Sequence, residues 1–467
     1  MTRVVIIGGG PGGYEAALVA RQLGGDVVLV ENDRMGGSAV VTDCVPSKTL
    51  IATADVMTGV AESEQLGIRY SDGSSAQDTV RVDLAAVNQR VLGLAQQQSD
   101  DIATRLRTEG IRIITGTGRL DGPRTVVATT EAGEESIPAD VVLLATGAHP
   151  RVLPDAVPDG ERILTWTQVY DLQTLPERLI VVGSGVTGAE FASAYDALGA
   201  DVVLVSSRDR VLPGEDADAA QVLEDVFTRR GMTVMGKSRA ASVRRDGDQV
   251  VVTLTDGREV TGSHCLLAVG SIANTADLGL ETAGVECDEA GFIAVDKVSR
   301  TTTNGVYAAG DCTGVLMLAS VAAMQGRIAM WHALGDAVSP LDLKQVSSNV
   351  FTAPEIATVG ATQTDVDTAE VRAVGVMLPL RTNPRAKMQG VADGFVKVFC
   401  LPLTGIIIGG VVVAPRASEL VHALSLAVHS RTTVDDFAQA FTIYPSVSGS
   451  LAEAARQLHL HAVEHVR

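Results

Sequence analysis

Two stretches of the chain share one pattern of apolar and polar positions. Residues 3–31 (RVVIIGGGPGGYEAALVARQLGGDVVLVE) and residues 179–206 (LIVVGSGVTGAEFASAYDALGADVVLVS) each start with a β-branched apolar run. Each then passes through a glycine turn into an alanine-rich segment and a second apolar run, and an offset of 175 positions aligns the two copies without a gap. This pattern predicts two βαβ units, each with a pair of parallel strands.

Further apolar runs extend the two units and then give way to a different pattern. Residues 139–151 and 262–275 predict a buried strand in each half, and GVYAAGDC (305–312) predicts a strand and glycine turn before Asp311. From residue 346 the chain predicts alternating strands around 373–413 and alanine-rich helices near 417–431 and 450–460. We therefore expect an α/β fold with two Rossmann-like dinucleotide-binding domains and a C-terminal α+β domain. The expected boundaries are 1–150 with its continuation 273–342, then 151–272, and finally 343–467.

Composition and charge limit the classes of partner. The 467 residues are 46 % hydrophobic and carry a formal net charge of −19, so neither nucleic acid nor an anionic membrane is expected as the main partner. The chain has no apolar run of 18 residues and no signal-peptide pattern, so neither a membrane span nor secretion is expected. The five cysteines are scattered and lack metal-ligand spacing. They favour a reducing cytoplasm, and no metal is expected.

The glycine turns point to nucleotide binding. In a G-x-G-x-x-G turn the first glycine permits a tight bend, the second lets the backbone approach a pyrophosphate, and the third lets helix and strand pack. The phosphates then lie at the N-terminus of the helix, where unpaired N–H groups favour anions. Gly8, Gly10 and Gly13 form the first copy, and the second is Gly183, Gly185 and Gly188.

The two copies end in different residues. Glu31 closes the first copy, where a carboxylate would accept both ribose hydroxyls of an adenosine. Ser206 stands at the matching place of the second copy, and Arg208 and Arg210 follow it. Arginines in place of an acid favour a 2′-phosphate, because a guanidinium binds phosphate with two hydrogen bonds. NADPH is therefore expected in the second site, with NADH use left open, and solvated loop arginines are the alternative.

The order of these motifs resembles the flavoprotein disulfide reductases. Along the chain stand the first glycine turn, Cys44 with Pro-Ser-Lys at 46–48, and Ala-Thr-Gly at 145–147. The second glycine turn, Gly-Asp at 310–311 and a C-terminal α+β domain follow. The two glycine turns are called the first and second fingerprint below. The resemblance implies FAD in the first site, a nicotinamide nucleotide in the second and a homodimer formed by the C-terminal domain. It also implies that the partner subunit completes each active site.

Carried over residue by residue, the resemblance gives the expected sites. Lys48 would lie near flavin N5 and pair with Glu190, and Asp311 would hold the ribityl chain. The expected FAD site comprises Gly8, Gly10, Pro11, Gly13, Glu31, Lys48, Thr146, Gly147, Gly310, Asp311 and Ala319. The expected NAD(P) site comprises Gly183, Gly185, Gly188, Glu190, Ser206, Arg208 and Gly270, and the expected catalytic residues are Lys48, Glu190, Cys44 and Tyr444.

The chain departs from the family both in the pair of sulfurs and in the acid–base residues that serve them. Ala39 replaces the sulfur that would attack substrate, and Cys44 remains alone. Thiol–disulfide exchange needs both an attacking and a resolving thiol. Tyr444 and Gly449 replace the family's histidine and glutamate, and a tyrosine is a poor base near neutrality. Cys44 is therefore expected to be a structural or flavin-tuning neighbour rather than half of a disulfide.

Without a dithiol relay, electrons must leave from the flavin itself. Quinones suit this role because flavins pass one or two electrons, so an NAD(P)H:quinone oxidoreductase is the main hypothesis. In it, hydride passes from nicotinamide to flavin N5, and two electrons then pass to the quinone. Tyr444 from the partner subunit could donate a hydrogen bond to a quinone oxygen, or it could only pack at the dimer interface. The alternatives are a soluble pyridine nucleotide transhydrogenase, a dihydrolipoamide dehydrogenase and a non-enzymatic FAD-binding redox sensor.

Overall fold

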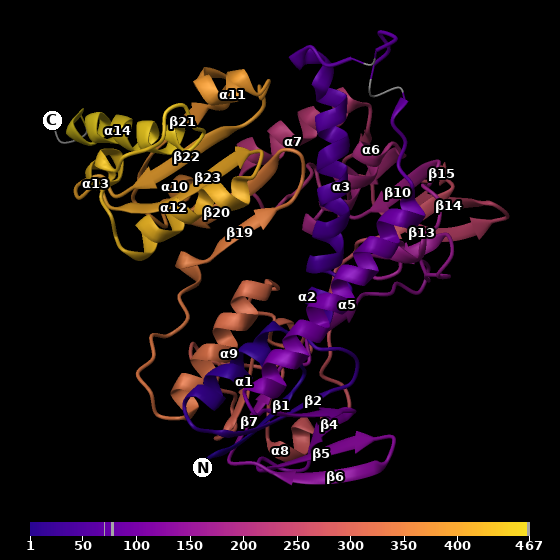
Figure 1. The fold of residues 1–467 in the computed structure, drawn as a ribbon, viewed down its shortest axis with the longest axis vertical. Coiled ribbons are helices and arrows are strands. Elements are labelled where there is room, and N and C mark those ends of the chain that lie inside the picture. Colours follow the sequence, from indigo (N-terminus) through magenta and orange to yellow (C-terminus); the bar gives the residue numbers. More distant parts are fainter. Residues whose placement is uncertain (70, 76–78, 465–467) are drawn as a thin grey trace. The chain divides into compact units, whose positions relative to one another are not determined.

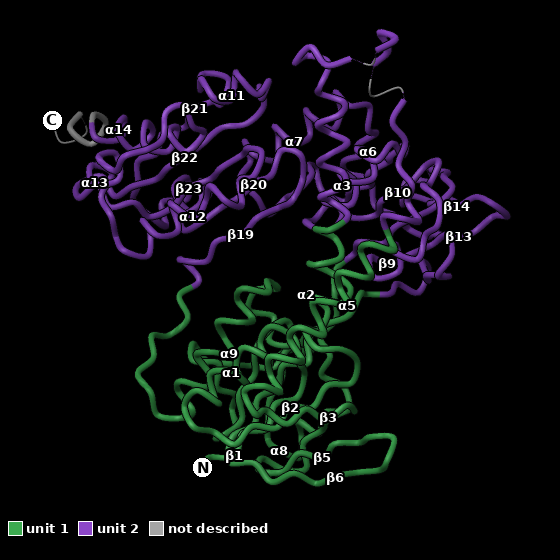
Figure 2. Tube along the Cα trace, in the orientation of Figure 1, with its two compact units in different colours: residues 1–49, 88–151, 270–342 green, residues 50–87, 152–269, 343–467 purple. Residues whose placement is uncertain are grey.

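The computed structural model describes residues 1–69, 71–75 and 79–464, with side chains up to residue 459. The chain forms two compact units (Figure 2). The first comprises residues 1–49, 88–151 and 270–342, and the second comprises the remaining segments, 50–87, 152–269 and 343 onward. Among the described residues, no helix is long and apolar enough to cross a membrane.

The first unit is built on a parallel five-stranded sheet in the order β18-β7-β1-β2-β3 (Figure 1). Its strands are β1 (Arg3–Ile7), β2 (Asp26–Glu31), β3 (Arg112–Thr115), β7 (Val141–Leu144) and β18 (Val306–Ala308). Helix α1 (Pro11–Gln22) connects β1 to β2 and packs on α9 (Ala319–Ala333). The two helices touch at glycines, because a Cβ on Gly326 would lie 2.1 Å from the carbonyl oxygen of Gly12.

Smaller elements complete the first unit. An antiparallel sheet contains β4 (Thr117–Leu120), β5 (Thr125–Thr130) and β6 (Gly133–Pro138), and a two-stranded ribbon pairs β8 (Ala148–Pro150) with β17 (Ser271–Ala273). The helices are α2 (Gly37–Val41), α8 (Leu280–Ala283), the beginning of α3 (Cys44–Glu62) and most of α5 (Leu84–Thr108), with the 3-10 turn η3 (Asp311–Thr313). The ribbon lies where the chain leaves the first unit after residue 151 and re-enters it at residue 270.

The second unit begins with a matching parallel sheet in the order β12-β11-β10-β16-β9. Its strands are β9 (Ile163–Thr165), β10 (Arg178–Val182), β11 (Asp201–Val205), β12 (Thr233–Met235) and β16 (His264–Leu267), with helices α6 (Val186–Leu198) and α7 (Ala217–Arg230) and the turns η1 (Ser63–Leu66) and η2 (Val169–Asp171). The register of the paired strands follows the sequence repeat. Arg3 lies opposite Asp26 in the first sheet, and Arg178 lies opposite Asp201 in the second, at the same offset of 175 positions. The two predicted βαβ units are confirmed.

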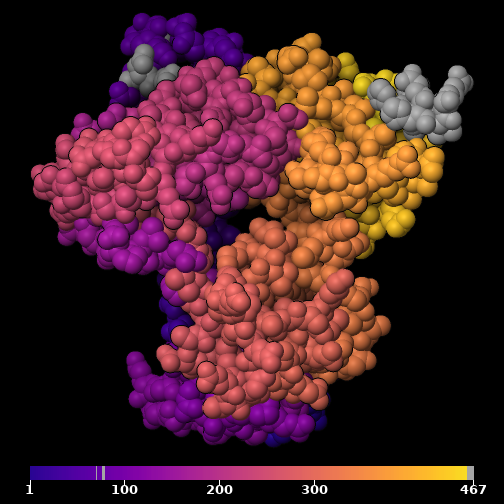
Figure 3. Space-filling model, turned by 180° about the vertical axis from the view of Figure 1, so that it is seen from behind, coloured from indigo at the N-terminus to yellow at the C-terminus, as the bar shows by residue number. Residues whose placement is uncertain are grey.

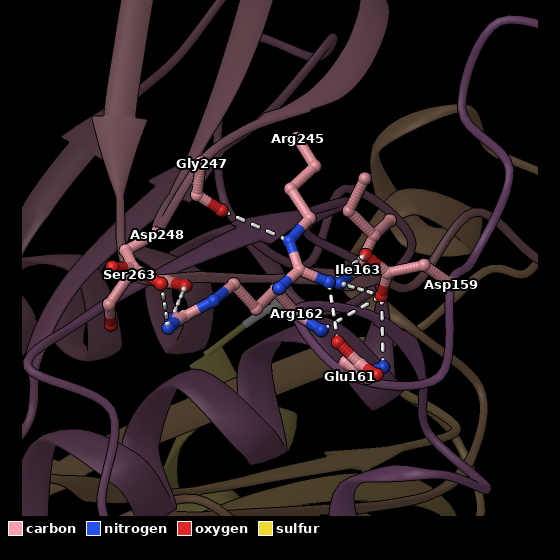
Figure 4. Close-up of polar contacts among 8 residues, drawn as sticks. All are labelled: Asp159, Glu161, Arg162, Ile163, Arg245, Gly247, Asp248 and Ser263. Atoms are coloured by element: carbon pink, nitrogen blue, oxygen red, sulfur yellow. Dashed lines mark hydrogen bonds and ion pairs between the residues drawn. The ribbon is translucent and has the colours of Figure 1, made fainter.

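An antiparallel sheet covers part of this domain and is fixed to it by charges. It contains β13 (Ala240–Asp246), β14 (Gln249–Leu254) and β15 (Glu259–Gly262). Arg245 on β13 forms ion pairs with Glu161 and Asp159 in the loop before β9, and Arg162 pairs with Asp248 in the β13–β14 turn (Figure 4). Oδ1 of Asp159 also accepts three backbone hydrogen bonds from residues 161–163, which shapes the loop itself.

The C-terminal part is an α+β domain, as predicted, shown in orange to yellow in Figures 1 and 3. Its antiparallel sheet has the order β19-β20-β23-β22-β21, with β19 (Ser347–Val350), β20 (Glu355–Gly360), β21 (Val374–Pro379), β22 (Phe395–Cys400) and β23 (Ile407–Ala414). The helices are α10 (Gln363–Asp367), α11 (Pro384–Met388), α12 (Ala417–His429), α13 (Val434–Gln439) and α14 (Gly449–Glu464), with η4 (Leu343–Gln345) and η5 (Leu380–Thr382). The expected alternation of buried and exposed side chains fails in β22, where all six residues are buried.

Candidate functional site

A cavity of about 790 Å³ lies in the first unit at the carboxyl ends of its parallel strands. This is the edge of an open α/β sheet where ligands bind. Nine of the eleven residues expected to hold FAD line it: Gly8, Gly10, Pro11, Glu31, Thr146, Gly147, Gly310, Asp311 and Ala319. Gly13 and Lys48 do not line it.

The first glycine turn explains why Gly13 lies outside the cavity. Gly8 has a φ of +102°, and a Cβ there would lie 2.2 Å from the carbonyl oxygen of Ala145 on the neighbouring strand. A Cβ on Gly13 would lie 1.8 Å from the carbonyl oxygen of Gly8, so this glycine lets α1 pack on the turn. A Cβ on Gly10, by contrast, would meet only the Cα of Gly37, at an ordinary contact distance of 3.9 Å, which leaves the Gly10 backbone accessible to a phosphate.

The second fingerprint repeats this geometry in the second unit. Gly183 has a φ of +112° and would meet the carbonyl oxygen of Ala268 at 2.1 Å, and Gly188 would meet Gly183 itself at 1.9 Å. Gly185, which precedes α6, has nothing within 4 Å of a hypothetical Cβ. Two crowded glycines and one open glycine therefore recur in both copies, as phosphate binding requires.

Glu31 ends β2 with its side chain only 7 % exposed. Its Oε2 accepts a hydrogen bond from the backbone N–H of Gly9 at 2.6 Å, and its Oε1 accepts one from Asp33 at 2.9 Å. The carboxylate therefore fixes the glycine turn as well as lining the cavity. The sequence motif indicates its ribose role but gives no sign of this second one.

The loop that carries Asp311 is supported by Gln325, a residue that no sequence motif indicated. Gln325, which is buried on α9, accepts a hydrogen bond from the N–H of Gly310 at 2.8 Å and donates one to Thr313 at 3.3 Å. Gly310 itself has a φ of +84°. Burial, with a smaller contribution from the nearby Asp43 carboxylate, raises the pKa of Asp311 to about 6. Asp43 also lines the cavity, so two carboxylates face this side of it.

Replacing Asp311 with asparagine should stabilise the protein without FAD at pH 8. A carboxyl whose pKa is raised on folding binds its proton more tightly in the folded state, so stability falls as pH rises from about 4 to 6 and then stays lower. Asparagine avoids this loss, and we expect a gain of about 1–3 kcal/mol at pH 8 but almost none at pH 4. Urea unfolding of the apoprotein at both pH values measures it.

The exposed Asp336 provides the matched control, because Asp336→Asn removes the same charge from a solvated position of the first unit. An equal gain for Asp311→Asn at both pH values would contradict the burial argument. Asp311→Asn should also bind FAD more weakly, although it stabilises the protein without FAD. The two measurements therefore separate the effect of Asp311 on the fold from its effect on the site.

Cys44 and Ala39 both line the cavity, at the start of α3 and within α2 respectively. None of the five cysteines, all within the described residues, forms a disulfide, and Cys265, Cys312 and Cys400 are buried in hydrophobic cores. Ala39 thus contributes a methyl group to the cavity wall, where a redox-active pair with Cys44 would require a second sulfur. Across the described part of the chain, no three His, Cys, Asp or Glu residues gather as a metal-binding group.

Ser206 is completely buried, although the sequence placed it in the NAD(P) site. Its hydroxyl lies 2.7 Å from that of Ser184 in the glycine turn and accepts a hydrogen bond from the N–H of Arg208 at 3.1 Å. Ser206 therefore positions the loop that carries Arg208, whose side chain is exposed. Gly270 has a φ of +93° and open space beside it.

The remaining expected catalytic residues lie on two helices and in the loop between α13 and α14. Glu190 on α6 is 3 % exposed, and its Oε1 accepts a hydrogen bond from the N–H of Phe351 at 2.9 Å. Lys48, on α3, is half-buried. Tyr444 is 82 % exposed and follows the exposed Phe441 and Ile443. Its role, and the pairing of Lys48 with Glu190, stay predictions.

The two fingerprints, the cavity and the C-terminal α+β domain define a two-dinucleotide oxidoreductase fold. The chain belongs to the pyridine nucleotide-disulphide oxidoreductase family, whose model matches residues 2–326, and the family's dimerisation domain matches residues 346–455. This confirms the expected family and fold class.

Among curated proteins, the NAD(P)H dehydrogenase (quinone) of Mycobacterium tuberculosis is 53 % identical over 99 % of this chain and 94 % of its own length. The dihydrolipoyl dehydrogenase of Chlamydia pneumoniae is 33 % identical over 97 % of this chain and 95 % of its own. Among solved structures, LpdA from M. tuberculosis superimposes with a TM-score of 0.93 and 52 % identity over 98 % of this chain and all of that chain.

Proposed function

We propose that this protein is an FAD-dependent NAD(P)H:quinone oxidoreductase. The observation that carries the proposal is the pair Ala39 and Cys44 on the wall of the cavity, because one sulfur cannot form a redox disulfide. The 53 % identity to a protein named NAD(P)H dehydrogenase (quinone) supports the same acceptor. The balanced reaction takes NAD(P)H, a proton and a quinone to NAD(P)⁺ and the quinol.

The residues of the cavity suit FAD. The N–H groups at the start of α1 would face its pyrophosphate, Glu31 would accept its adenosine ribose hydroxyls, and Asp311 would accept a ribityl hydroxyl. Bound FAD supplies the redox chemistry, since it can accept hydride from a nicotinamide and pass one or two electrons to an acceptor. Asp311, with its pKa near 6, would receive hydrogen bonds best at and above neutral pH.

The second fingerprint would bind the nicotinamide nucleotide. We propose NADPH as its preferred form, because Arg208 is exposed in the loop after β11 and Ser206 replaces the carboxylate that an NADH-specific site would present there. Lys48 and Glu190 would position the reacting rings, and Tyr444 from the partner of a homodimer would face the quinone. The five cysteines, none of which forms a disulfide, are consistent with a reducing compartment, and a cytoplasmic location is part of the proposal.

Two related activities share this fold. A transhydrogenase passing hydride from NADPH to NAD⁺ would also work with the single Cys44, so it remains the second candidate. Dihydrolipoyl dehydrogenase activity is disfavoured despite the 33 % identity to such an enzyme, because Ala39 cannot attack a disulfide and Tyr444 is a poor base near neutrality.

Steady-state oxidation of NADPH by FAD-loaded protein distinguishes these activities when a naphthoquinone, lipoamide and NAD⁺ are compared as acceptors. We expect quinone turnover to exceed lipoamide turnover by at least about 100-fold, because the thiol route lacks its attacking sulfur. Cys44→Ser is the internal control and should retain quinone turnover within about threefold, since no sulfur chemistry is required of it.

Each other outcome identifies a different enzyme. NAD⁺ as the best acceptor would identify a transhydrogenase. Rapid lipoamide turnover that Cys44→Ser abolishes would show that a disulfide route operates after all, and would overturn the proposal.

A further inference from the structure

The loop that carries Arg208 lies against a second loop, at the end of β12. The N–H of Lys237 donates to the carbonyl oxygen of Arg208 at 2.7 Å, and the N–H of Ser238 donates to that of Ser206 at 2.7 Å. A Cβ on Gly236 would lie 3.2 Å from the carbonyl oxygen of Asp209. The backbone bonds of Lys237 and Ser238 therefore fix the Lys237 backbone beside that of Arg208.

The two cations share this surface without an ion pair. The side chains of Arg208 and Lys237 are both exposed, and neither forms a salt bridge with any residue that the structure describes. The chain has 56 acidic and only 37 basic Lys and Arg residues, so the two adjacent exposed cations form a small basic surface on a chain that is acidic overall. Asp209 is the nearest acid in sequence, and it is exposed and likewise forms no ion pair with them.

The conformation of Lys237 is also unusual. Its φ is +52°, a left-handed conformation in which glycine or asparagine is the ordinary residue. The next residue, Ser238, is buried, and its hydroxyl accepts a hydrogen bond from the Arg258 guanidinium at 2.9 Å. This bond helps to fix the conformation of the loop. The turn alone therefore gives no reason for a lysine at this position, whereas an anion bound beside Arg208 would.

We propose that Lys237 is a specificity-determining residue that binds the 2′-phosphate of NADPH together with Arg208. The inference rests on the proposed use of NADPH. A 2′-phosphate is a dianion near neutrality, and a guanidinium bound with two hydrogen bonds leaves a third oxygen for a compact ammonium. NADH has no such group, so Lys237 would discriminate between the two nucleotides.

Calorimetric binding of 2′,5′-ADP and 5′-AMP to FAD-loaded protein tests this, because the two probes differ only in the 2′-phosphate. Lys237→Gln should weaken 2′,5′-ADP about tenfold, as expected for one charge-assisted hydrogen bond at a partly exposed site, and leave 5′-AMP within about twofold. Lys237→Arg should retain most of the affinity. Lys297→Gln, an exposed lysine in the first unit, controls for net charge and should change neither probe.

Arg208→Gln separates failure of this inference from failure of the NADPH assignment. If Arg208→Gln weakens 2′,5′-ADP and Lys237→Gln does not, the role of Lys237 is overturned while the NADPH site stands. If neither variant discriminates between the probes, the NADPH assignment itself fails and the inference fails with it. Equal weakening of both probes by Lys237→Gln would also overturn the inference, since it would indicate a disturbed loop.

Discussion

Replacing Lys397 with methionine is expected to lower the free energy of unfolding of the second unit by about 3–5 kcal/mol. Lys397 on β22 is only 4 % exposed, and its ammonium lies 2.8 Å from Asp216 and 2.7 Å from Asp218. Asp216 is 2 % exposed and caps the N-terminus of α7 through the N–H groups of Asp218 and Ala219. Methionine fills similar space but leaves the Asp216 carboxylate buried without its cation.

The two acidic partners of Lys397 provide matched controls. Asp218 is 57 % exposed, so Asp218→Asn should cost less than about 1 kcal/mol, whereas Asp216→Asn should cost more because it leaves Lys397 buried with a weaker partner. The double variant Lys397→Met with Asp216→Asn removes both buried charges, and asparagine still caps a helix well, so it should recover part of the loss. Denaturant unfolding measures all four proteins, and equal costs for the two aspartate variants would contradict the role of burial.

The sequence repeat predicted much of the fold. Because residues 3–31 and 179–206 align without a gap, the strand registers at β1–β2 and β10–β11 follow from one another, and both are observed. The predicted C-terminal helices also correspond to α12 and α14. Lys397 could not be placed in this way. An alternating strand puts a lysine towards solvent, and its partner Asp216 lies 181 positions away in sequence, so only the contact between β22 and the N-terminal cap of α7 explains its burial.

The same limit applies to the candidate site. Motifs indicate which residues contact the ligand. Nine of the eleven residues expected at the FAD site do line the cavity. Motifs do not indicate which polar groups support them. Ser206 matches the position of a nucleotide-binding acid but is buried against Ser184, and Gln325 supports Gly310 from a helix with no motif of its own. Lys237 follows a short strand that no fingerprint covers, so only the hydrogen bond to Arg208 reveals it.

Glu31→Ala should weaken FAD binding by at least about 100-fold. The carboxylate would accept two ribose hydroxyls, and each hydrogen bond to a charged group contributes about 1.5–3 kcal/mol. The variant also leaves the N–H groups of Gly9 and Asp33 without their present acceptor, so the glycine turn beneath the pyrophosphate loses its support. Titration of apoprotein with FAD, followed by flavin fluorescence, gives the affinity.

Binding of FMN distinguishes a local role of Glu31 from a general loss of structure. FMN lacks the adenosine ribose, so its affinity should change by no more than about threefold in Glu31→Ala, through the weakened turn alone. Asp26→Asn, at the exposed opposite end of β2, should leave both flavins unaffected. If Glu31→Ala weakened FMN as strongly as FAD, the carboxylate would act only through the fold of the turn, and adenosine recognition would have to come from other residues of the cavity, of which Asn32 and Asp33 are the nearest polar ones in sequence.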